Sequence, residues 1–387
     1  MSAPVVTDSG VGSRQIQVQN ILDVALRGLE PMFYSSKNLF CYRLRLTPAG
    51  LVKEGLSYRY TLMTLLGLHR AVEAGFDSPI DRSAVYNALH NDGAWPDNAG
   101  DLGLYLWLCA LYSPEQLDQA LRTCNIAIAL HDATDARECR TMELAWVLSG
   151  LSHAQLTGIP GIPDLRQQAS HVYNLLRANQ GPYGLFGHQA SRGVMGSLRG
   201  RIGSFADQVY PIYALAKCAE AFDDLREGAL SRATGCADAI CRLQGPLGQW
   251  WWHYDAMSGH VLGDYPVYSV HQDAMAPMAL FALAEAVALN FDGPIFKGLN
   301  WIFGENEVGR DLRDSEGILV WRSLFQPKVQ TRCNELLRFA GLPGSSGRVR
   351  IKYEDRPYHL GWVLYAFAGY GNHVSQRSET GSWTCQP

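Results

Sequence analysis

Charged side chains are scarce in this chain. Asp, Glu, Lys and Arg make up 18% of its 387 residues, and 33 basic against 37 acidic side chains leave a formal net charge of −4. A surface that binds nucleic acid or an anionic membrane carries an excess of basic residues, which this sequence lacks. We therefore expect no nucleic-acid partner.

The sequence also lacks segments that direct a chain into or across a membrane. Residues 1–14 have no basic start followed by an apolar run, so a signal peptide is not expected. The most apolar stretch, Ala274–Leu289, is too short to span a bilayer and contains Glu285, which indicates a core helix. These absences predict a cytoplasmic protein without a transmembrane segment.

Motifs for metals and nucleotides are missing as well. The nine cysteines include no CxxC pair, which indicates reduced thiols rather than a disulfide framework or a zinc site. The 11 histidines form no H-x-x-x-H or H-E-x-x-H motif, and neither a Walker loop nor a strand-linked G-x-G-x-x-G occurs. We therefore expect no bound metal and no cofactor.

Apolar, aromatic and glycine residues are abundant. Hydrophobic residues make up 47% of the chain and aromatic ones 11%, and the 38 glycines exceed the average share of roughly 7%. A chain of this composition can bury a large core and has many turns.

Two segments repeat at a spacing of 66 residues. Asp207 precedes Pro211 by four positions and Asp273 precedes Pro277 in the same way, each before a run rich in Ala and Leu. Asp near the N-cap and Pro in the first turn are typical of a helix start. Because the runs are apolar on nearly every face, they predict inner helices.

Six such inner helices alternate along the chain with more amphipathic segments. The inner helices are predicted to begin near Ser57, Asp101, Thr141, Asp207, His271 and Tyr358. The amphipathic segments are 14–29, 82–89, 115–130, 164–177, 229–243 and 291–303, with a further element at 329–339.

This alternation predicts an all-α fold, an (α/α)6 toroid of outer and inner helices. It forms a single domain over residues 14–370, between a flexible N-terminus at 1–13 and a flexible C-terminal tail at 371–387. An open helical solenoid is the alternative, although the atypical capping repeats of a solenoid are missing.

The turns before two of these helices share a further pattern. Residues 244–250 read Q-x-x-x-G-x-W, and residues 180–186 are a near match that ends in Phe. The pattern resembles the repeat of the squalene and terpene cyclases and of the protein prenyltransferases. This resemblance implies the α-toroid superfamily, in which the repeat ties the end of an outer helix to the next inner helix. The D-x-D-D proton donor of the cyclases and the Asp-x-Cys zinc ligands of the prenyltransferases are absent.

In a closed toroid, side chains at the starts of the inner helices converge on the mouth of the cavity. Each Asp there could instead cap its helix, and Arg59 could pair with Glu143. The candidate catalytic residues are Asp273, His271, Glu143, Asp101 and Asp207. The candidate substrate-binding residues are Arg59, Tyr60, Trp95, Tyr210, Trp251, Trp252, His253, Tyr265, Tyr268, Gln272 and His359.

The segment 250–273 is the richest in these residues. Three consecutive Trp at 250–252 cannot all point into a core, so at least one is expected to line a pocket. His253 and Asp273 could form a dyad across the loop between them. Because aromatic walls stabilise carbocations and also stack on sugar rings, they do not decide between those two chemistries.

A glycine-rich stretch at 193–203 is flanked by three arginines. Without a preceding strand it does not predict a nucleotide site, and we expect either a lid over the mouth or an anion clamp. The arginines are Arg192, Arg199 and Arg201.

Three functions remain open at this stage. The resemblance implies an enzyme that cyclises an isoprenoid by acid initiation, with a buried Asp273 as proton donor. The alternative is a carbohydrate-active (α/α)6 enzyme, a hydrolase, lyase or uronate epimerase that uses paired carboxylates or His and Tyr. A non-catalytic binding toroid is the third. The expected partner is a small molecule, isoprenoid or saccharide, and a homo-oligomer is compatible with the sequence.

Overall fold

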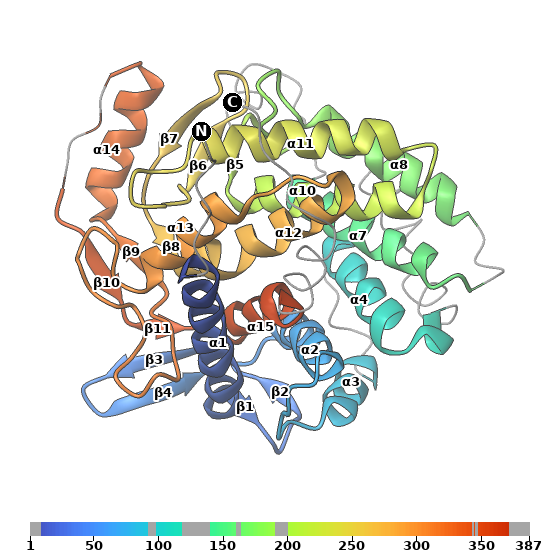
Figure 1. Cartoon of the computed structure of the whole chain (residues 1–387), viewed down its shortest axis with the longest axis horizontal. Coiled ribbons are helices and arrows are strands. Elements are labelled where there is room, and N and C mark those ends of the chain that lie inside the picture. The colour runs from blue at the N-terminus through green and yellow to red at the C-terminus, as the bar shows by residue number, and fades with distance from the viewer. Residues whose placement is uncertain are drawn as a thin grey trace, which may run out of the picture.

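The computed structural model describes residues 9–91, 98–117, 140–159, 164–189, 200–342, 344 and 347–370. Over these ranges the chain is mostly helical, and the helices form two concentric layers (Figure 1). The predicted all-α toroid is thereby confirmed, and the residues that we predicted to start the inner helices lie at or within two positions of their first turns.

The inner layer is a closed ring of six helices. Each packs on the next in chain order, and the last packs on the first, which excludes the open solenoid. A π-helical turn, His271–Met275, leads directly into the fifth helix. The six are α2 (Tyr58–Glu73), α4 (Ala99–Tyr112), α7 (Thr141–Leu156), α10 (Ala206–Ala221), α12 (Ala276–Val287) and α15 (Pro357–Phe367).

The outer helices pack against this ring from outside. They are α1 (Ser9–Leu29), α3 (Arg82–Asn91), α8 (Leu165–Ala178), α11 (Arg226–Arg242) and α13 (Asp292–Ile302), and the further predicted element is α14 (Lys328–Phe339). Helix α1 begins at Ser9 and so includes residues 9–13 of the expected N-terminal segment. The predicted outer helix at 115–130 lies mostly outside the described residues, as do the expected tail at 371–387 and residues 1–8.

Small residues allow the inner helices to approach one another closely. A Cβ on Gly67 of α2 would lie 1.9 Å from the carbonyl oxygen of Gly361 in α15. In the same way, a Cβ on Gly150 of α7 would lie 2.3 Å from the carbonyl oxygen of Gly103 in α4. Any side chain at these positions would push the two helices apart.

The glutamine turns join neighbouring outer helices. Gln180 follows α8 and donates to the carbonyl oxygens of Gly184 (2.8 Å) and of Arg232 in α11 (3.0 Å). Gln244 follows α11 and donates to those of Gly248 (3.0 Å) and of Pro294 in α13 (2.9 Å). The turn thus fixes the spacing of the outer layer, whereas the resemblance implied a link to the next inner helix.

Aromatic side chains fill the centre of the ring. The indole of Trp107 in α4 stacks on His153 of α7, Tyr213 of α10 and Trp362 of α15, with ring centroids 5.2, 4.8 and 5.6 Å apart. All four are buried, and the Tyr213 hydroxyl bonds to His153 Nε2 at 2.9 Å.

Short antiparallel sheets, which were not predicted, lie at one end of the ring. One sheet contains β3 (Arg43–Thr47), β4 (Gly50–Glu54) and β11 (Glu354–Asp355), and a second contains β5 (Ile202–Ser204), β6 (His253–Asp255) and β7 (His260–Gly263). A third contains β8 (Val267–Tyr268), β9 (Ser323–Phe325) and β10 (Arg350–Lys352). The strands β1 (Phe33–Tyr34) and β2 (Leu39–Phe40) form a separate pair. Strands β4, β5, β8 and β11 each end shortly before an inner helix begins, so the sheets surround the mouth formed by the helix N-termini.

No helix in the part of the chain that the structure describes is long and apolar enough to cross a membrane.

Candidate active site

Three buried side chains at the mouth form a hydrogen-bonded triad. His359, near the start of α15, bonds through Nε2 to Asp273 Oδ1 at 2.8 Å and through Nδ1 to Asp355 Oδ1 at 2.9 Å. All three are at most 3% exposed. The other oxygen of Asp355 accepts from the Val320 backbone, whereas Asp273 Oδ2 is buried and has no partner among the described residues.

The triad shifts the titration of its members. Burial opposes a charge on His359, but the two adjacent carboxylates outweigh it and raise the pKa of the imidazole to about 10. Burial raises the pKa of Asp273 and of Asp355, and the charge of His359 counteracts that rise. At neutral pH His359 is therefore an imidazolium between two carboxyl groups.

His271 lies on the π-helical turn, two residues before Asp273. Burial, reinforced by the positive charges of Arg322 and His359, lowers the pKa of His271 to about 3. Its ring lies parallel to the indole of Trp252, with centroids 6.0 Å apart, and contacts Phe205 and Tyr268. The mouth thus holds a neutral imidazole close to a charged one.

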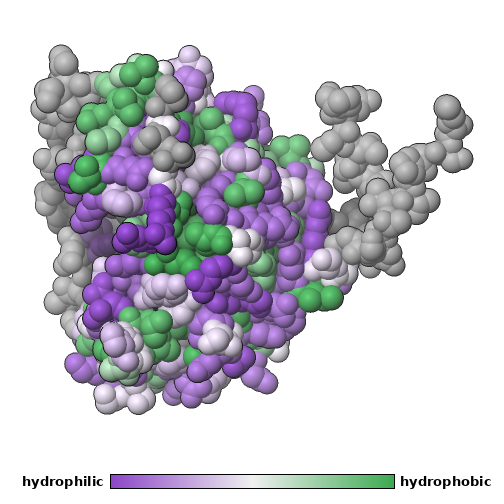
Figure 2. Space-filling view, turned by 90° about the vertical axis from the view of Figure 1, so that its left-hand side faces the viewer, coloured by the Kyte–Doolittle hydropathy of each residue, from purple (hydrophilic) through white to green (hydrophobic). Residues whose placement is uncertain are grey.

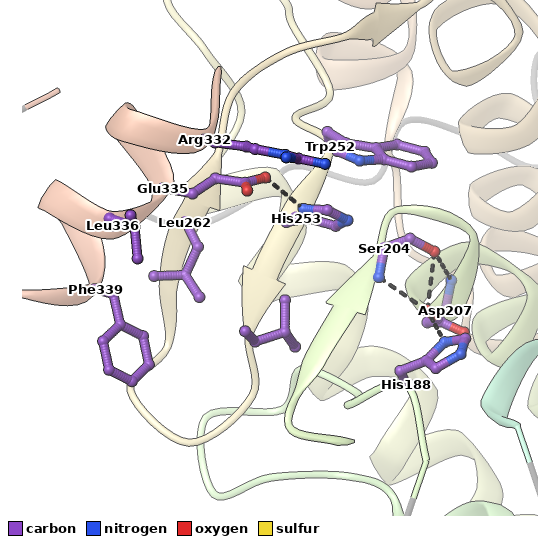
Figure 3. Close-up of a pocket in the computed structure, with 11 residues that line it drawn as sticks. His188, Ser204, Asp207, Trp252, His253, Leu262, Arg332, Glu335, Leu336 and Phe339 are labelled. Atoms are coloured by element: carbon purple, nitrogen blue, oxygen red, sulfur yellow. Dashed lines mark hydrogen bonds and ion pairs between the residues drawn. The ribbon is translucent and has the colours of Figure 1, made fainter. Parts of the chain in front are cut away.

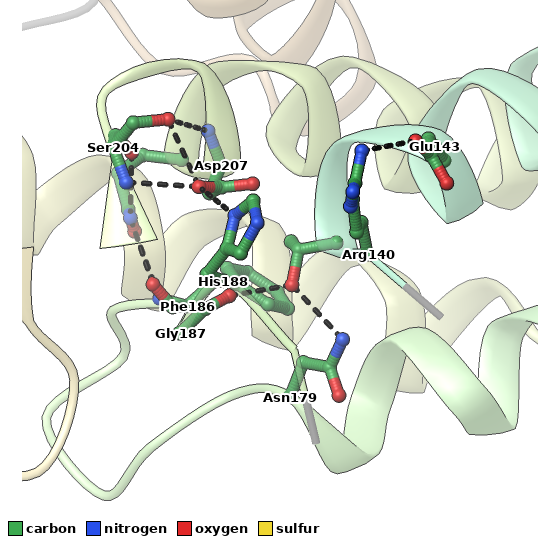
Figure 4. Close-up of polar contacts among 10 residues, drawn as sticks. Arg140, Glu143, Asn179, Phe186, Gly187, His188, Ser204 and Asp207 are labelled. Carbon is green, nitrogen blue, oxygen red and sulfur yellow. Dashed lines mark hydrogen bonds and ion pairs between the residues drawn. The ribbon is translucent and has the colours of Figure 1, made fainter. Parts of the chain in front are cut away.

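Asp207 anchors a second polar group, on α10. Its Oδ2 accepts from the backbone N–H and the hydroxyl of Ser204, at 2.8 and 2.9 Å, and lies 3.2 Å from Nδ1 of His188 (Figure 4). Its Oδ1 is buried and has no partner among the described residues. The Asp207 carboxylate therefore does more than cap its helix.

Arg59 and Asp101 form a two-bond ion pair between α2 and α4. The Nε–Oδ1 and Nη2–Oδ2 distances are 2.5 and 2.8 Å, and the guanidinium lies 5.6 Å from the ring of Trp146. Glu143 pairs instead with Arg140 at 3.2 Å, so the considered Arg59–Glu143 pair is wrong. Burial raises the pKa of Glu143, while Arg140 and Arg59 counteract it.

Aromatic rings and arginines continue the wall of the mouth. The ring of Tyr60 packs on Tyr358 at 4.5 Å, and its hydroxyl accepts from Arg356 at 2.6 Å. Tyr268 lies under the guanidinium of Arg322, 5.0 Å from its ring centroid. Cationic and hydrogen-bonding groups thus alternate with flat apolar faces.

Four of the predicted substrate-binding residues use their polar atoms in hydrogen bonds within the fold. Trp251 donates to the Leu243 carbonyl (3.0 Å), the Tyr265 hydroxyl donates to Glu307 (2.8 Å), and the Gln272 amide holds the Trp250 backbone (3.1 Å). The Tyr210 hydroxyl is buried and accepts from Trp362 at 2.9 Å. Their polar atoms are used by the fold, and Trp95 lies outside the described residues.

A cavity of about 650 Å³ opens beside the mouth, between the sheet β5–β6–β7 and α14 (Figure 3). Trp252 lines it, as expected for one of the three tryptophans. His253 lines it too, but its Nδ1 bonds to Glu335 of α14 at 2.8 Å, so the considered dyad with Asp273 is wrong.

The glycine-rich stretch at 193–203 is only partly described. Arg192 and Arg199 lie outside the described residues. Arg201 pairs with the buried Asp255 at 2.6 Å, so it is engaged within the sheet and is not a free anion clamp.

Several residues of the site were missed by sequence reasoning. Asp355 could have been found, because it lies directly before the predicted start of an inner helix, four positions before His359. His188, Arg322 and Tyr358 carry no such signal, since they reach the mouth from separate loops and from the ring itself. No group of three or more His, Cys, Asp or Glu suited to a metal ion occurs among the residues that the structure covers.

No protein-family model matches this chain, and no curated protein matches it either. Several solved structures do match this chain. Cellobiose 2-epimerase from Spirochaeta thermophila superposes with a TM-score of 0.64 at 13% identity, covering 96% of this chain and 100% of its own. A family 88 glycosyl hydrolase from Bacteroides vulgatus gives a TM-score of 0.59 at 12% identity, over 92% and 99% of the two chains. Cellobiose 2-epimerase from Bacillus thermoamylovorans gives 0.62 at 11%, over 93% and 100%.

The matched structures have the same fold as this chain, and they overturn the resemblance to terpenoid cyclases. The matched toroids are carbohydrate-processing enzymes, so the isoprenoid-cyclase interpretation is wrong. The misleading signal was the glutamine turn, which in this chain spaces the outer helices and carries no chemistry.

Proposed function

We propose that this protein is a carbohydrate-active enzyme, and that it moves a proton on a sugar bound at the mouth of the toroid, as an epimerase or isomerase does. One observation carries the proposal. Asp273 Oδ2 is a buried carboxylate oxygen without a partner among the described residues, the other oxygen of the same group bonds to the imidazolium of His359, and neutral His271 lies two positions before it on the π-helical turn. An unpaired buried oxygen destabilises the fold, so its retention favours a role in chemistry.

The roles follow from the protonation states. In an open-chain sugar, Oδ2 of the Asp273 carboxylate accepts the proton from the carbon next to the carbonyl, and the electron pair of that C–H bond forms an enediolate, whose oxygen accepts a hydrogen bond from neutral His271. After a rotation presents the other face of the carbon to Asp273, the carboxylic acid formed in the first step returns a proton to that carbon from Oδ2, which leaves the bond of Oδ1 to His359 intact and restores the carboxylate. The charges of His359 and Arg322 balance the negative enediolate. The carbonyl is regenerated, and only the configuration of the carbon changes.

Solvent exchange tests this reaction directly. Reducing monosaccharides, disaccharides and uronic acids are incubated with the protein in D2O and examined by mass spectrometry for a gain of one mass unit. Asp273→Asn and His271→Asn are each expected to slow the exchange by about 100-fold or more. Tyr265→Phe, a variant at a half-buried hydroxyl bonded to Glu307, is the matched control and should exchange at the parent rate.

A parent protein that incorporates no deuterium into any sugar of the panel would contradict the proposal. The same holds for an Asp273→Asn variant that is folded, by circular dichroism, and as active as the parent.

A second candidate, hydrolysis of a uronate-containing saccharide, is favoured by one specific observation. Burial raises the pKa of Glu143, which favours the protonated acid that cleavage requires, and Arg59 lies near enough to act on its charge. Its signature is the appearance of new reducing ends without deuterium at carbon, and Glu143→Gln should abolish it.

A further inference from the structure

The cavity beside the mouth has two chemically different ends. His188, Ser204 and Asp207 line the end next to the inner helices, whereas Leu262, Leu336 and Phe339 line the other (Figure 3). Trp252 and His253 lie between them in the same view. Trp252 lines the cavity and also stacks on His271, so the cavity lies directly beside the candidate active site.

The helix α14, which forms the apolar end, is held in place by polar contacts. Glu335 bonds to His253 at 2.8 Å and Arg338 pairs with Asp264 at 2.5 Å, while no residue of the helix is buried. Its apolar side chains remain solvent-accessible: Leu336 is 71% and Phe339 47% exposed. This side of the molecule shows hydrophobic patches between hydrophilic ones (Figure 2).

We propose that this cavity is the binding site for an apolar aglycone, an aryl or alkyl group joined to the sugar that occupies the mouth. The inference rests on the proposed function only for the position of the sugar: a glycoside cannot open to the chain form that epimerisation requires, so an aglycone-bearing sugar is a ligand for the second candidate reaction, hydrolysis. The cavity volume of about 650 Å³ is in the range of small-molecule sites, roughly 300–1,000 Å³. The polar end provides partners for hydroxyl groups, and Asp207 Oδ1 there has no partner among the described residues.

The far end favours an aryl or alkyl group over a second sugar. A sugar needs donors and acceptors along its whole rim, and at this end the carboxylate of Glu335 is already bonded to His253. Leu262, Leu336 and Phe339 provide apolar surface there, whereas Arg332, which also lines the cavity, extends its guanidinium away from them toward Trp252 (Figure 3). Burying such surface against a ligand releases free energy in proportion to the apolar area covered.

Equilibrium binding separates this inference from the proposed function. Calorimetric titrations compare 4-nitrophenyl β-D-glucoside and 4-nitrophenyl β-D-glucuronide with their methyl counterparts, and include 4-nitrophenol alone. The nitrophenyl glycosides should bind about tenfold more tightly than the methyl glycosides, and Leu336→Ala and Phe339→Ala should each remove most of that gain. Val329→Ala is the matched control, because Val329 is on the same helix, 76% exposed and not among the residues that line the cavity.

Each outcome decides one point. Equal affinity for nitrophenyl and methyl compounds, or variants at Leu336 and Phe339 that bind like the control, would overturn the aglycone site. A dimer seen by light scattering that dissociates in Leu336→Ala would overturn it as well, because a second copy would then cover this face. If the nitrophenyl preference is found but no saccharide reacts, the site stands and the proposed function fails.

Discussion

At the scale of single residues, the chemistry of the mouth depends on which groups are paired. His359 has a carboxylate on each ring nitrogen, His271 has aromatic rings around it, and Asp273 has one paired and one unpaired oxygen. The two histidines thus have very different proton affinities although both lie at the mouth.

Asp355→Asn is expected to lower the pKa of His359 from about 10 toward its ordinary value of 6.5. Removing one carboxylate removes part of the attraction that stabilises the imidazolium, while the burial that opposes the charge stays. A titration of the His359 ring followed by nitrogen-15 NMR measures this directly. A ring that titrates at the same pH in both proteins would show that Asp273 alone sets the charge.

The pairing of these residues could not be predicted from the sequence, except for one contact. Asp355 and His359 are only four positions apart, at the end of β11 and in the first turn of α15, so this contact is local in sequence. His359 and Asp273 are 86 positions apart, and Arg59 and Asp101 are 42 apart. Such contacts exist only once the ring has closed, so the sequence identified some of these residues as candidates, but not their partners.

At the scale of elements, the closest helix contacts depend on glycine. Gly67 and Gly361 lie where α2 meets α15, the contact that closes the ring. The Asp and Pro signals at the helix starts predicted the elements, because they act within one turn of the chain. The short sheets were missed because their strands are two to five residues long and pair across distant segments.

Gly67→Ala is expected to destabilise the protein by about 1–3 kcal/mol or more, since its Cβ would collide with the backbone of α15. Gly235→Ala in α11 is the matched control: a Cβ there meets nothing within 4 Å, and the loss of helix-interior glycine should stabilise by about 0.5–1 kcal/mol. Urea unfolding of both variants gives the two free energies. A Gly67→Ala protein as stable as the control would contradict the close contact.

Helix α14 is expected to open locally far more often than the inner helices. It buries none of its residues, whereas most of α7 and α10 is buried. In amide hydrogen exchange its protection should be at least about 100-fold lower than theirs, because few apolar contacts are lost when it opens. Binding of a nitrophenyl glycoside should slow this exchange in α14 but not in α11.

At the scale of the whole molecule, burial of neutral histidines makes the fold sensitive to acid. Burial lowers the pKa of His153 well below its usual 6.5 and that of His271 to about 3. Below pH 6.5 the unfolded chain therefore binds protons that the folded chain does not. Stability is lost as the pH falls from 6.5, at up to about 1.4 kcal/mol per pH unit for each of the two groups.

His153→Phe is expected to reduce the loss of stability per pH unit by the contribution of one histidine. Urea unfolding between pH 4 and 7 measures the slope of the unfolding free energy against pH. The slopes of the two proteins are compared, and not their absolute stabilities, because the variant also loses the bond to Tyr213. His260→Gln, at an exposed position, is the control and should keep the parent slope. An unchanged slope in His153→Phe would mean that its protonation is not linked to unfolding.

The aromatic stack at the centre of the ring determines how a ligand enters and leaves the toroid. Trp107, His153, Tyr213 and Trp362 fill the space between the inner helices, so the toroid is a cup and has no through-channel at this point. Whatever enters at the mouth must leave by the same opening. In the proposed enzyme, a product molecule that remains at the mouth blocks the next substrate molecule. The rate of turnover is then set by the rate at which product leaves through this single opening.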